Sequence, residues 1–351
     1  MRIIVDVMGG DNAPLETVKG VCQAAAEYDA EYTVVGNRSE IEKIAQENGL
    51  DLSGFELVHA ETVIDMEDDP LSVVRAKSDS SMSMGLRLLA EGKGDAFVST
   101  GNTGALFTGA TLIVRKIKGI QRAALAMILP VNPPLLLLDC GANVVVNDEY
   151  LEQFAVMGSA YMKKMYKLRS PRVGLLNNGT EESKGTELQR LAYQRLSACN
   201  KIKFVGNVEG SAIPNDVCDV LVTDGFTGNV VLKTIEGVSK LMMHSIKDIF
   251  YANALTKVSA LMVKGRVSEF KKNFDATEHG GAPLLGISRP VIKAHGSSNA
   301  NAFKNAIRQA IAYSNSGMIY DIADAAADFM AAKKAAKLAE EAEKPASEKQ
   351  E

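Results

Sequence analysis

Short apolar runs alternate along this chain with longer segments in which apolar residues recur at helical spacing. The first run covers residues 3–7 and is followed by a helical pattern at 15–28. A second run at 32–35 precedes a second helical pattern at 39–48. Alternation of this kind is typical of strands joined by helical crossovers. The pattern therefore predicts an α/β fold built on a parallel sheet.

Seven further apolar runs predict additional strands, with helices between most of them. These runs are 55–58, 96–99, 124–129, 135–138, 173–176, 204–205 and 217–222. In open sheets of this type, ligands bind beyond the carboxyl ends of the strands. The residues that directly follow each run are therefore the first candidates for a functional site.

Composition indicates one folded body with a polar tail. A hydrophobic content of 46% in 351 residues is ample for a large core, so residues 1–330 are expected to form a single catalytic α/β domain. From Ala331 the sequence is a mixture of Ala, Lys and Glu with no large apolar residue after Leu338. Residues 331–351 are therefore predicted to be a frayed helix or a disordered tail.

Charge and cysteine usage exclude several classes of protein. A formal charge of −4 gives no global positive field that would recruit nucleic acid. The four cysteines are far apart, with no CxxC pair, which indicates neither a zinc site nor a disulfide framework. The chain opens directly on a strand, without a signal-peptide pattern, so a cytoplasmic location is expected. Residues 96–114 carry no charge, but their Ser, Thr, Asn and Gly content argues against a membrane span.

Glycine and polar residues gather after the first and fourth predicted strands. After the first strand come Gly9, Gly10 and Asp11, where backbone amides can approach an anion; an ordinary turn is the alternative. After residue 99 come Gly101, Asn102, Thr103 and Gly104, whose amides and hydroxyls suit a bound phosphate. Helix capping by the hydroxyls is the alternative here. Neither segment matches a dinucleotide fingerprint or a nucleotide P-loop.

Later strand ends repeat the theme. They supply Asn143 after Asp139, Lys184 in a glycine-containing segment, and Asn229 at the end of residues 224–229. Lys184 can clamp phosphate or protonate a leaving group, although a lone loop lysine is more often a solvated surface residue. Cys140 has no identifiable partner base, so it is not expected to act as a nucleophile.

A last glycine-containing segment precedes the final helical pattern. His295, Gly296 and Ser297 lie there, and His295 is either a site residue or a histidine satisfied by neighbouring backbone. Ser297 or Ser298 is expected to cap the helix that follows.

Residues 239–274 form a second informative region. Apolar residues repeat there at helical spacing and predict two amphipathic helices. From Lys240 to Lys272 the sequence contains seven basic and two acidic residues. This is a local excess of five positive charges in an acidic protein. This asymmetry favours adsorption to an anionic bilayer, with Leu255, Val258, Leu261 and Met262 as membrane-binding residues. A Met-rich stripe that packs a dimer interface or the core is the alternative.

The loops taken together resemble the bacterial phosphate acyltransferase family, also called acyl-[acyl-carrier-protein]:phosphate transacylase. The resemblance runs from Met1 to about Ser316 and rests on seven motifs in order. They are residues 8–11, 99–106, 139–143, 175–179 with 184–185, 224–229, 280–286 and 295–298. Each motif alone is weak, but seven in order over most of the chain are specific.

The resemblance implies a Rossmann-like three-layer fold similar to isocitrate and isopropylmalate dehydrogenases and to phosphotransacetylase. It implies a homodimer that has no bound metal or nicotinamide. This homodimer is expected to associate peripherally with the inner face of the cell membrane. The implied reaction moves a long-chain acyl group from acyl carrier protein to inorganic phosphate, for phospholipid synthesis. A membrane glycerol-3-phosphate acyltransferase that consumes acyl phosphate is a further implied partner.

The resemblance also assigns roles. Asn229 matches a family position regarded as catalytic and would donate to the developing oxyanion, while Lys184 would stabilise phosphate and protonate the departing thiolate. The other glycine-loop residues named above would bind phosphate and substrate. The rival interpretations are a short-chain phosphotransacetylase acting on a CoA thioester, a catalytically silent membrane scaffold, and a dehydrogenase suggested by fold analogy alone.

Overall fold

The computed structural model describes residues 1–253, 256–257, 259–260, 262–263, 265–266 and 280–343. Eleven strands form one sheet in these residues. They are β1 (Arg2–Asp6), β2 (Glu31–Gly36), β3 (Phe55–His59), β4 (Ala96–Ser99), β5 (Ala124–Leu129), β6 (Leu135–Leu138), β7 (Arg172–Asn177), β8 (Lys203–Glu209), β9 (Val220–Val222), β10 (Ala282–Leu285) and β11 (Val291–Lys293). Each of the first nine overlaps a run that the sequence predicts, so those strand predictions are confirmed.

The sheet is mixed, and the prediction of a purely parallel sheet is wrong. Its order is β3-β2-β1-β4-β11-β10-β5-β6-β9-β7-β8. One block of parallel strands runs from β3 to β11 and another from β6 to β8, and the pairs β11–β10, β10–β5 and β5–β6 are antiparallel. Three antiparallel steps reverse the direction of the second block relative to the first.

Two of the strands at this junction were not predicted. β10 contains Pro283, which cannot donate to a ladder, and β11 is only three residues long. Both lack the length and the alternation that identify a strand in a sequence. Yet they join the two halves of the sheet, because β11 pairs with β4 and β10 pairs with β5.

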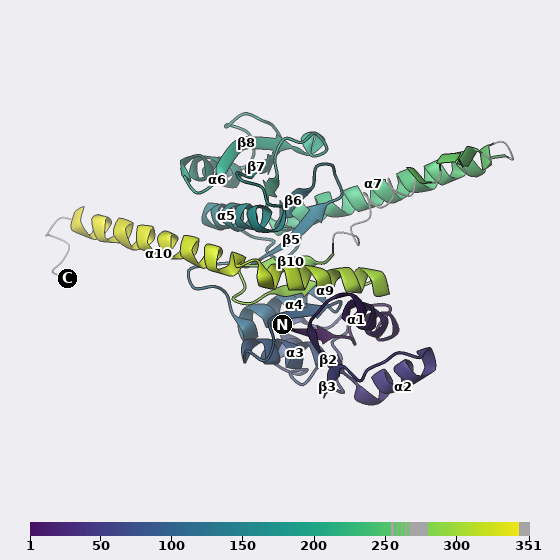
Figure 1. Ribbon diagram of the computed structural model, residues 1–351. Helices are drawn as coiled ribbons and strands as arrows, with labels where there is room; N and C mark the ends of the chain where they lie inside the picture. The colour runs from purple at the N-terminus through teal and green to yellow at the C-terminus, as the bar shows by residue number, and fades with distance from the viewer. Residues whose placement is uncertain (254–255, 258, 261, 264, 267–279, 344–351) are drawn as a thin grey trace.

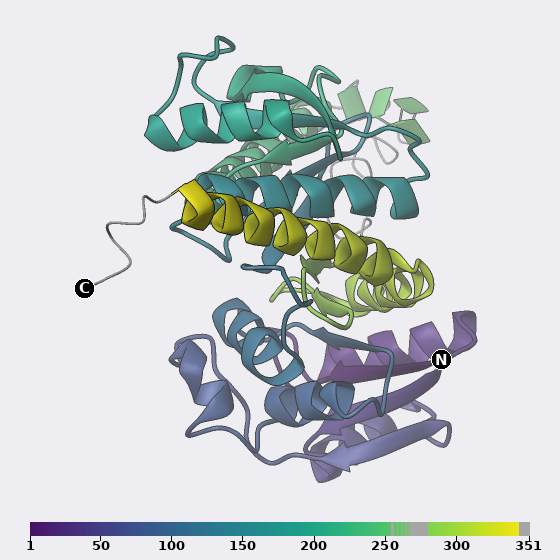
Figure 2. The ribbon, with the colours of Figure 1, turned by 90° about the vertical axis from the view of Figure 1, so that its left-hand side faces the viewer.

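Helices cover both faces of the sheet, and the molecule has two lobes (Figures 1 and 2). The helices are α1 (Leu15–Glu27), α2 (Arg38–Asn48), α3 (Ser81–Ala90), α4 (Thr103–Gly109), α5 (Asp148–Met165), α6 (Glu187–Ala198), α7 (Gly225–Tyr251), α9 (Ala300–Asn315) and α10 (Met318–Glu343). Short helical turns lie at η1 (Pro70–Val74), η2 (Ala110–Val114) and η3 (Gly210–Ala212). The three-layer α/β fold expected from the sequence is confirmed.

Alternation along the strands explains the three layers. In β1, Ile3 and Val5 face one hydrophobic core together with residues of α1, α5 and α9, while Ile4 faces a second core with residues of α3 and α4. All three side chains are fully buried. Because successive side chains of a strand point to opposite faces, a strand that is apolar throughout must be covered on both sides.

The two long helices α7 and α10 extend away from the body of the molecule (Figure 1). α10 continues as helix from Met318 through the start of the predicted tail to Glu343. α7 is a single 27-residue helix that begins at Gly225, well before the amphipathic pattern at residue 239. Leu255, Val258 and Leu261 lie outside the described residues, as does most of the second predicted amphipathic helix. No described helix is long and apolar enough to cross a bilayer.

Candidate active site

Three loops meet at the carboxyl ends of β1, β4 and β11. The amide of Asp11 donates to the carbonyl of Gly296 (2.8 Å), and the hydroxyl of Thr100 donates to the carbonyl of Gly9. A Cβ on Gly9 would lie 2.6 Å from the Cα of Gly101, so only glycines allow this approach. The sequence prediction that these glycines gather at strand ends is therefore realised in space, with the backbones themselves in contact.

A buried carboxylate supports the same loops from below. Asp6, at the end of β1, accepts from the Ser99 hydroxyl (2.8 Å) and from the amide of Met8 (3.1 Å). The Ser99 hydroxyl oxygen in turn accepts from the amide of Gly101 (3.0 Å). Burial raises the pKa of Asp6, and these hydrogen bonds oppose the rise. The network fixes the β4 loop relative to β1.

Asn102 anchors the β4 loop to a distant segment. Its side-chain oxygen caps α4 by accepting from the amide of Ala105 (3.1 Å), and its amide nitrogen donates to the carbonyls of Asp65 and Met66. Thr103 and Gly104 form the start of α4. The alternative of a cap by the Ser and Thr hydroxyls is wrong, because the side chain of Asn102 caps α4 while the loop that carries it joins the cluster.

His295 lies on the surface of this cluster and is held by its own loop. Its Nδ1 accepts from the amide of Ser297 (3.2 Å) and lies 2.9 Å from the Ser297 hydroxyl oxygen. An Nδ1 that accepts an amide proton leaves the ring proton of neutral histidine on Nε2. Partial desolvation, followed by the charge of Lys233, lowers the pKa of His295. The neutral ring therefore presents an Nε2–H donor. The expected N-cap at Ser297 or Ser298 is wrong, because Asn299 caps α9.

A second cluster follows β6. Asp139 is fully buried and accepts four hydrogen bonds, from the amides of Leu125, Ala142 and Asn143 and from the Asn143 side chain. The same side-chain nitrogen of Asn143 also donates to the carbonyl of Ala123 (2.7 Å). The polar side chains of Asp139 and Asn143 thus hold the shape of this loop, and this sets the position of Gly141 between them.

The start of α7 packs directly on this second loop. Asp224 caps the helix by accepting from the amide of Thr227 (2.8 Å), so residues 225–229 are helix rather than the loop that the sequence indicated. A Cβ on Gly228 would lie 1.9 Å from the carbonyl oxygen of Asp139. The Asn229 side chain is a neighbour of Gly141, since a Cβ built on Gly141 would lie 4.0 Å from the Asn229 Cγ, at the outer limit of van der Waals contact.

One turn beyond Asn229, α7 carries a lysine that relates the two clusters electrostatically. Lys233 forms an ion pair with Glu236 (2.9 Å). The charges of both residues act on the pKa of Cys140, in the β6 loop, and on that of His295, in the β11 loop. Both clusters therefore lie within electrostatic reach of the same stretch of α7.

Sheet twist explains how loops on strands of opposite direction come together. Neighbouring strands rotate by about 20–25° each, so the five steps from β4 to β9 accumulate about 100–125°. The second block runs opposite to the first, at 180° before twist is considered. The accumulated rotation reduces this angle, so that the strand directions of the two blocks differ by about 55–80°. The carboxyl ends of β4 and β9 can then face a shared space.

Lys184 lies farther along the second block. It follows β7, which pairs with β9, and its side chain is exposed. Its backbone is fixed, because its amide donates to the carbonyl of Glu181 (3.1 Å) and its carbonyl accepts from the side chain of Asn177 (3.2 Å). Within the described residues its ammonium has neither a hydrogen bond nor an ion pair. Lys184 thus follows a strand of the same block as β9, and its side chain is unpaired among the described residues.

The remaining candidate groups, a cysteine thiol, possible metal ligands and a predicted membrane residue, show no catalytic arrangement among the described residues. Cys140 is buried, its thiol lies 3.0 Å from the carbonyl oxygen of Leu125, and burial raises its pKa well above the ordinary value. No cluster of three or more metal-type ligands occurs in the part of the chain that the structure describes. Met262, the one predicted membrane residue inside the described part, is 85% exposed.

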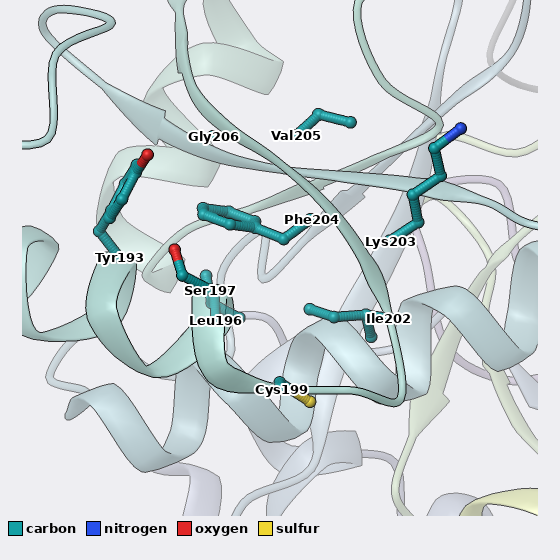
Figure 3. Close-up of a pocket in the computed structure, with 9 residues that line it drawn as sticks. All are labelled: Tyr193, Leu196, Ser197, Cys199, Ile202, Lys203, Phe204, Val205 and Gly206. Atoms are coloured by element: carbon teal, nitrogen blue, oxygen red, sulfur yellow. The ribbon is translucent and has the colours of Figure 1, made fainter.

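A hollow of about 470 Å³ lies elsewhere, between the C-terminal end of α6 and the first half of β8 (Figure 3). Tyr193 and Phe204 meet there edge to face, 5.2 Å apart. Its lining contains none of the predicted site residues. Because it borders the beginning of β8 rather than its carboxyl end, it is separate from the site described above.

The fold defines the class of protein. Similar solved structures include a phosphotransacetylase from Streptococcus pyogenes, with a TM-score of 0.62 and 17% identity over 89% of this chain and 94% of that one. A 4-hydroxythreonine-4-phosphate dehydrogenase from Klebsiella pneumoniae has a TM-score of 0.54 and 11% identity over 90% of this chain and 99% of that one. The expected likeness to phosphotransacetylase and to dehydrogenases of this architecture is confirmed, and at these identities it concerns the fold alone.

Sequence relatives narrow the class to a family. The model of the family described as "Fatty acid synthesis protein" matches residues 1–320. The phosphate acyltransferase of Thermoanaerobacter pseudethanolicus is 46% identical over 88% of this chain and 92% of its own length. That of Clostridioides difficile is 42% identical over 92% and 95%. The chain belongs to the phosphate acyltransferase family, and it is an acyltransferase of lipid synthesis, as the motifs indicated.

The structure adds three residues that the sequence did not single out as site residues. Lys293 lies buried beneath the first cluster, and Lys233 and Glu236 lie on α7 within electrostatic reach of both clusters. Lys293 ends a strand that was not predicted. Lys233 and Glu236 follow Asn229 by four and seven residues, and this helical spacing would have identified them had α7 been expected to begin at Gly225.

Proposed function

We infer that this enzyme transfers a long-chain fatty acyl group from the thioester of acyl carrier protein to inorganic phosphate. The product, acyl phosphate, then enters phospholipid synthesis. The observation that carries the proposal is that both clusters lie within electrostatic reach of one stretch of α7. One cluster offers backbone amides and a neutral histidine suited to phosphate, and the other offers Asn229 beside an open glycine loop suited to a thioester carbonyl.

Phosphate itself is the nucleophile in this proposal. The only cysteine in either cluster, Cys140, is buried and held against a backbone carbonyl, which argues against an acyl-enzyme. An oxygen of the phosphate dianion attacks the thioester carbon, so a C–O bond forms and the C–S bond breaks. The electron pair leaves with sulfur as thiolate, which takes a proton to give the free carrier thiol.

The named residues divide between the two substrates. The loops that contain Gly9, Gly101 and Gly296, with their neighbours Gly10, Asp11, Asn102, Thr103, Gly104 and Ser297, bind phosphate, and His295 donates from Nε2. Asn143 holds the second loop so that Asn229 donates to the oxygen that becomes negative. The Lys184 ammonium, which has no hydrogen bond or ion pair among the described residues, stabilises phosphate and supplies the proton that the thiolate takes, leaving a neutral amine.

The exposed surface of α7 supports a homodimer. Val238, Leu241, Met242 and Ile249 are between 48% and 67% exposed and recur along one side of the helix. An apolar stripe of this length on a projecting helix is typical of a surface covered by another chain, which we propose is a second copy of this protein. The basic, apolar segment beyond Tyr251 would then contact the anionic inner face of the cell membrane.

The test is carrier-thiol release from a long-chain acyl carrier protein, with and without inorganic phosphate, with acyl-CoA and acetyl-CoA in parallel. Phosphate-dependent release from the carrier substrate, with acyl phosphate recovered, is the expected result. A preference for acetyl-CoA would reassign the enzyme to short-chain phosphotransacetylase chemistry. Thiol release at the same rate with and without inorganic phosphate would overturn the proposal.

A further inference from the structure

Lys293 is the last residue of β11, and its side chain lies beneath the first loop cluster. The residue is 7% exposed. Its ammonium donates to the carbonyl of Thr100 (2.8 Å), just after β4, and to that of Ala294 (2.5 Å), just after β11. It therefore ties together the two loops whose glycines approach the β1 loop.

The charge of this ammonium is not neutralised directly. No carboxylate of the described residues lies within ion-pair distance of it, and its two hydrogen-bond acceptors are neutral carbonyls. A buried cation without a paired anion is costly, and an apolar side chain of similar length would fill the same space at lower cost. A lysine rather than an apolar residue at this buried position points to an anion that binds nearby.

The groups facing Lys293 come from four segments. The carboxylates of Asp6, on β1, and Asp11, in the loop after β1, favour its charged form, whereas Lys233 on α7 opposes it. The nearby His295 ring experiences the Lys293 charge in turn. Burial has the largest effect and lowers the pKa of Lys293 to about 8. The amine therefore titrates in a range where an assay can follow it.

The space above the ammonium is built from backbone. A Cβ on Gly10 would lie 2.8 Å from the carbonyl oxygen of Gly296 and 2.8 Å from the hydroxyl of Thr100. The three loops are thus in contact beside Thr100, whose carbonyl accepts from the Lys293 ammonium. A small anion bound to these loops would experience the charge of that ammonium through little intervening solvent.

We propose that Lys293 is a positioning residue of the phosphate site, which fixes the β4 and β11 loops and supplies the buried positive charge that complements a bound phosphate dianion. The identity of the anion rests on the proposed function. By linkage, phosphate binding and protonation of Lys293 favour each other. Phosphate should therefore bind more weakly as the pH rises above about 8, where phosphate itself remains dianionic.

Two variants separate charge from shape. In Lys293→Met we expect the KM for phosphate to rise by about tenfold or more, with a smaller change in kcat, because uniform binding is lost. In Lys293→Arg the charge no longer titrates, so the KM for phosphate should stay flat between about pH 7.5 and 9.5, while that of the wild type rises by up to about tenfold per pH unit. Lys304→Met is the matched control, since Lys304 pairs with Glu27 away from the loops.

Inorganic phosphate binding is measured on the full chain by calorimetry and by the thermal shift that phosphate produces, alongside thiol release. Equal phosphate affinity of Lys293→Met and the wild type, or a wild-type pH dependence retained in Lys293→Arg, would overturn the proposal. Should Lys293→Met not fold, the Lys293→Arg pH profile decides alone. A wild type that binds phosphate through Lys293 but releases no thiol would refute the proposed function while leaving this inference intact.

Discussion

The contact between α7 and the β6 loop provides the sharpest test of the site, through Gly228. A Cβ at this position would lie 1.9 Å from the carbonyl oxygen of Asp139, where ordinary contact begins at 3.4 Å. Gly228→Ala must therefore move α7 and the β6 loop apart by about 1.5 Å. The clash is with a backbone oxygen, so no side-chain rotation can relieve it. The substitution moves Asn229 away from Gly141 without changing any polar side chain.

Two opposing effects set the magnitude. Overpacking costs about 1–3 kcal/mol, and replacing a helical glycine by alanine returns about 1 kcal/mol. We expect a net loss of up to about 2 kcal/mol in the free energy of unfolding. The effect on turnover should be larger, about 10²-fold, because displacement of about 1 Å at a reacting centre is costly.

Gly237→Ala is the matched control on the same helix. A Cβ there meets nothing within 4 Å, so we expect the same propensity gain, about 0.5–1 kcal/mol, without a clash. Urea unfolding and phosphate-dependent thiol release are measured for both variants. If Gly228→Ala were as stable and as active as Gly237→Ala, the close packing of α7 on the β6 loop would not be what positions Asn229.

Lys184→Ala should lower phosphate-dependent turnover by about 10²-fold, and near-normal turnover would contradict its role. Asp139→Asn places a donor against two of the four donors that the carboxylate accepts from, so the free energy of unfolding should fall by about 1–3 kcal/mol in urea titrations. In phosphate-free buffer Lys293 should add stability as pH rises from about 8 to 10.5, because its amine is then neutral when folded but protonated when unfolded; Lys293→Met should lack this gain. Leu255→Glu combined with Leu261→Glu should abolish binding to anionic vesicles, and unchanged binding would refute the membrane contact.

The sequence was sufficient for most of the sheet and for the loops of the site. Continuous apolar runs such as Leu135–Leu138 identify buried strands directly, because every side chain must be apolar when both faces are covered. Glycines such as Gly9 and Gly101 could be placed at strand ends by the same reasoning. What could not be read was their mutual contact, since residues 92 apart in sequence carry no local signal of it.

The junction of the sheet was beyond sequence patterns for a physical reason. β10 and β11 are short, and β10 contains a proline, so neither has the periodicity of an independent strand. They form because neighbouring edges of the sheet already exist. The burial of Lys293 could not be predicted for the same reason. A lysine at the end of a strand that is not predicted is expected to be a surface residue, and only the tertiary packing shows that it is buried.

Reversal of the sheet at this junction matters for the chemistry. A purely parallel sheet would gather all its loops along one edge, with phosphate and thioester bound side by side. Here three antiparallel steps reverse the second block, and twist turns it partly back, so that two separately built clusters lie within electrostatic reach of one stretch of α7. Attack on a thioester requires the nucleophile to approach the face of the carbonyl, so two opposed half-sites suit this reaction better than one row of loops. In the proposed reaction, the position of α7, which Gly228 allows to pack closely on the β6 loop, would then set the distance between the two substrates.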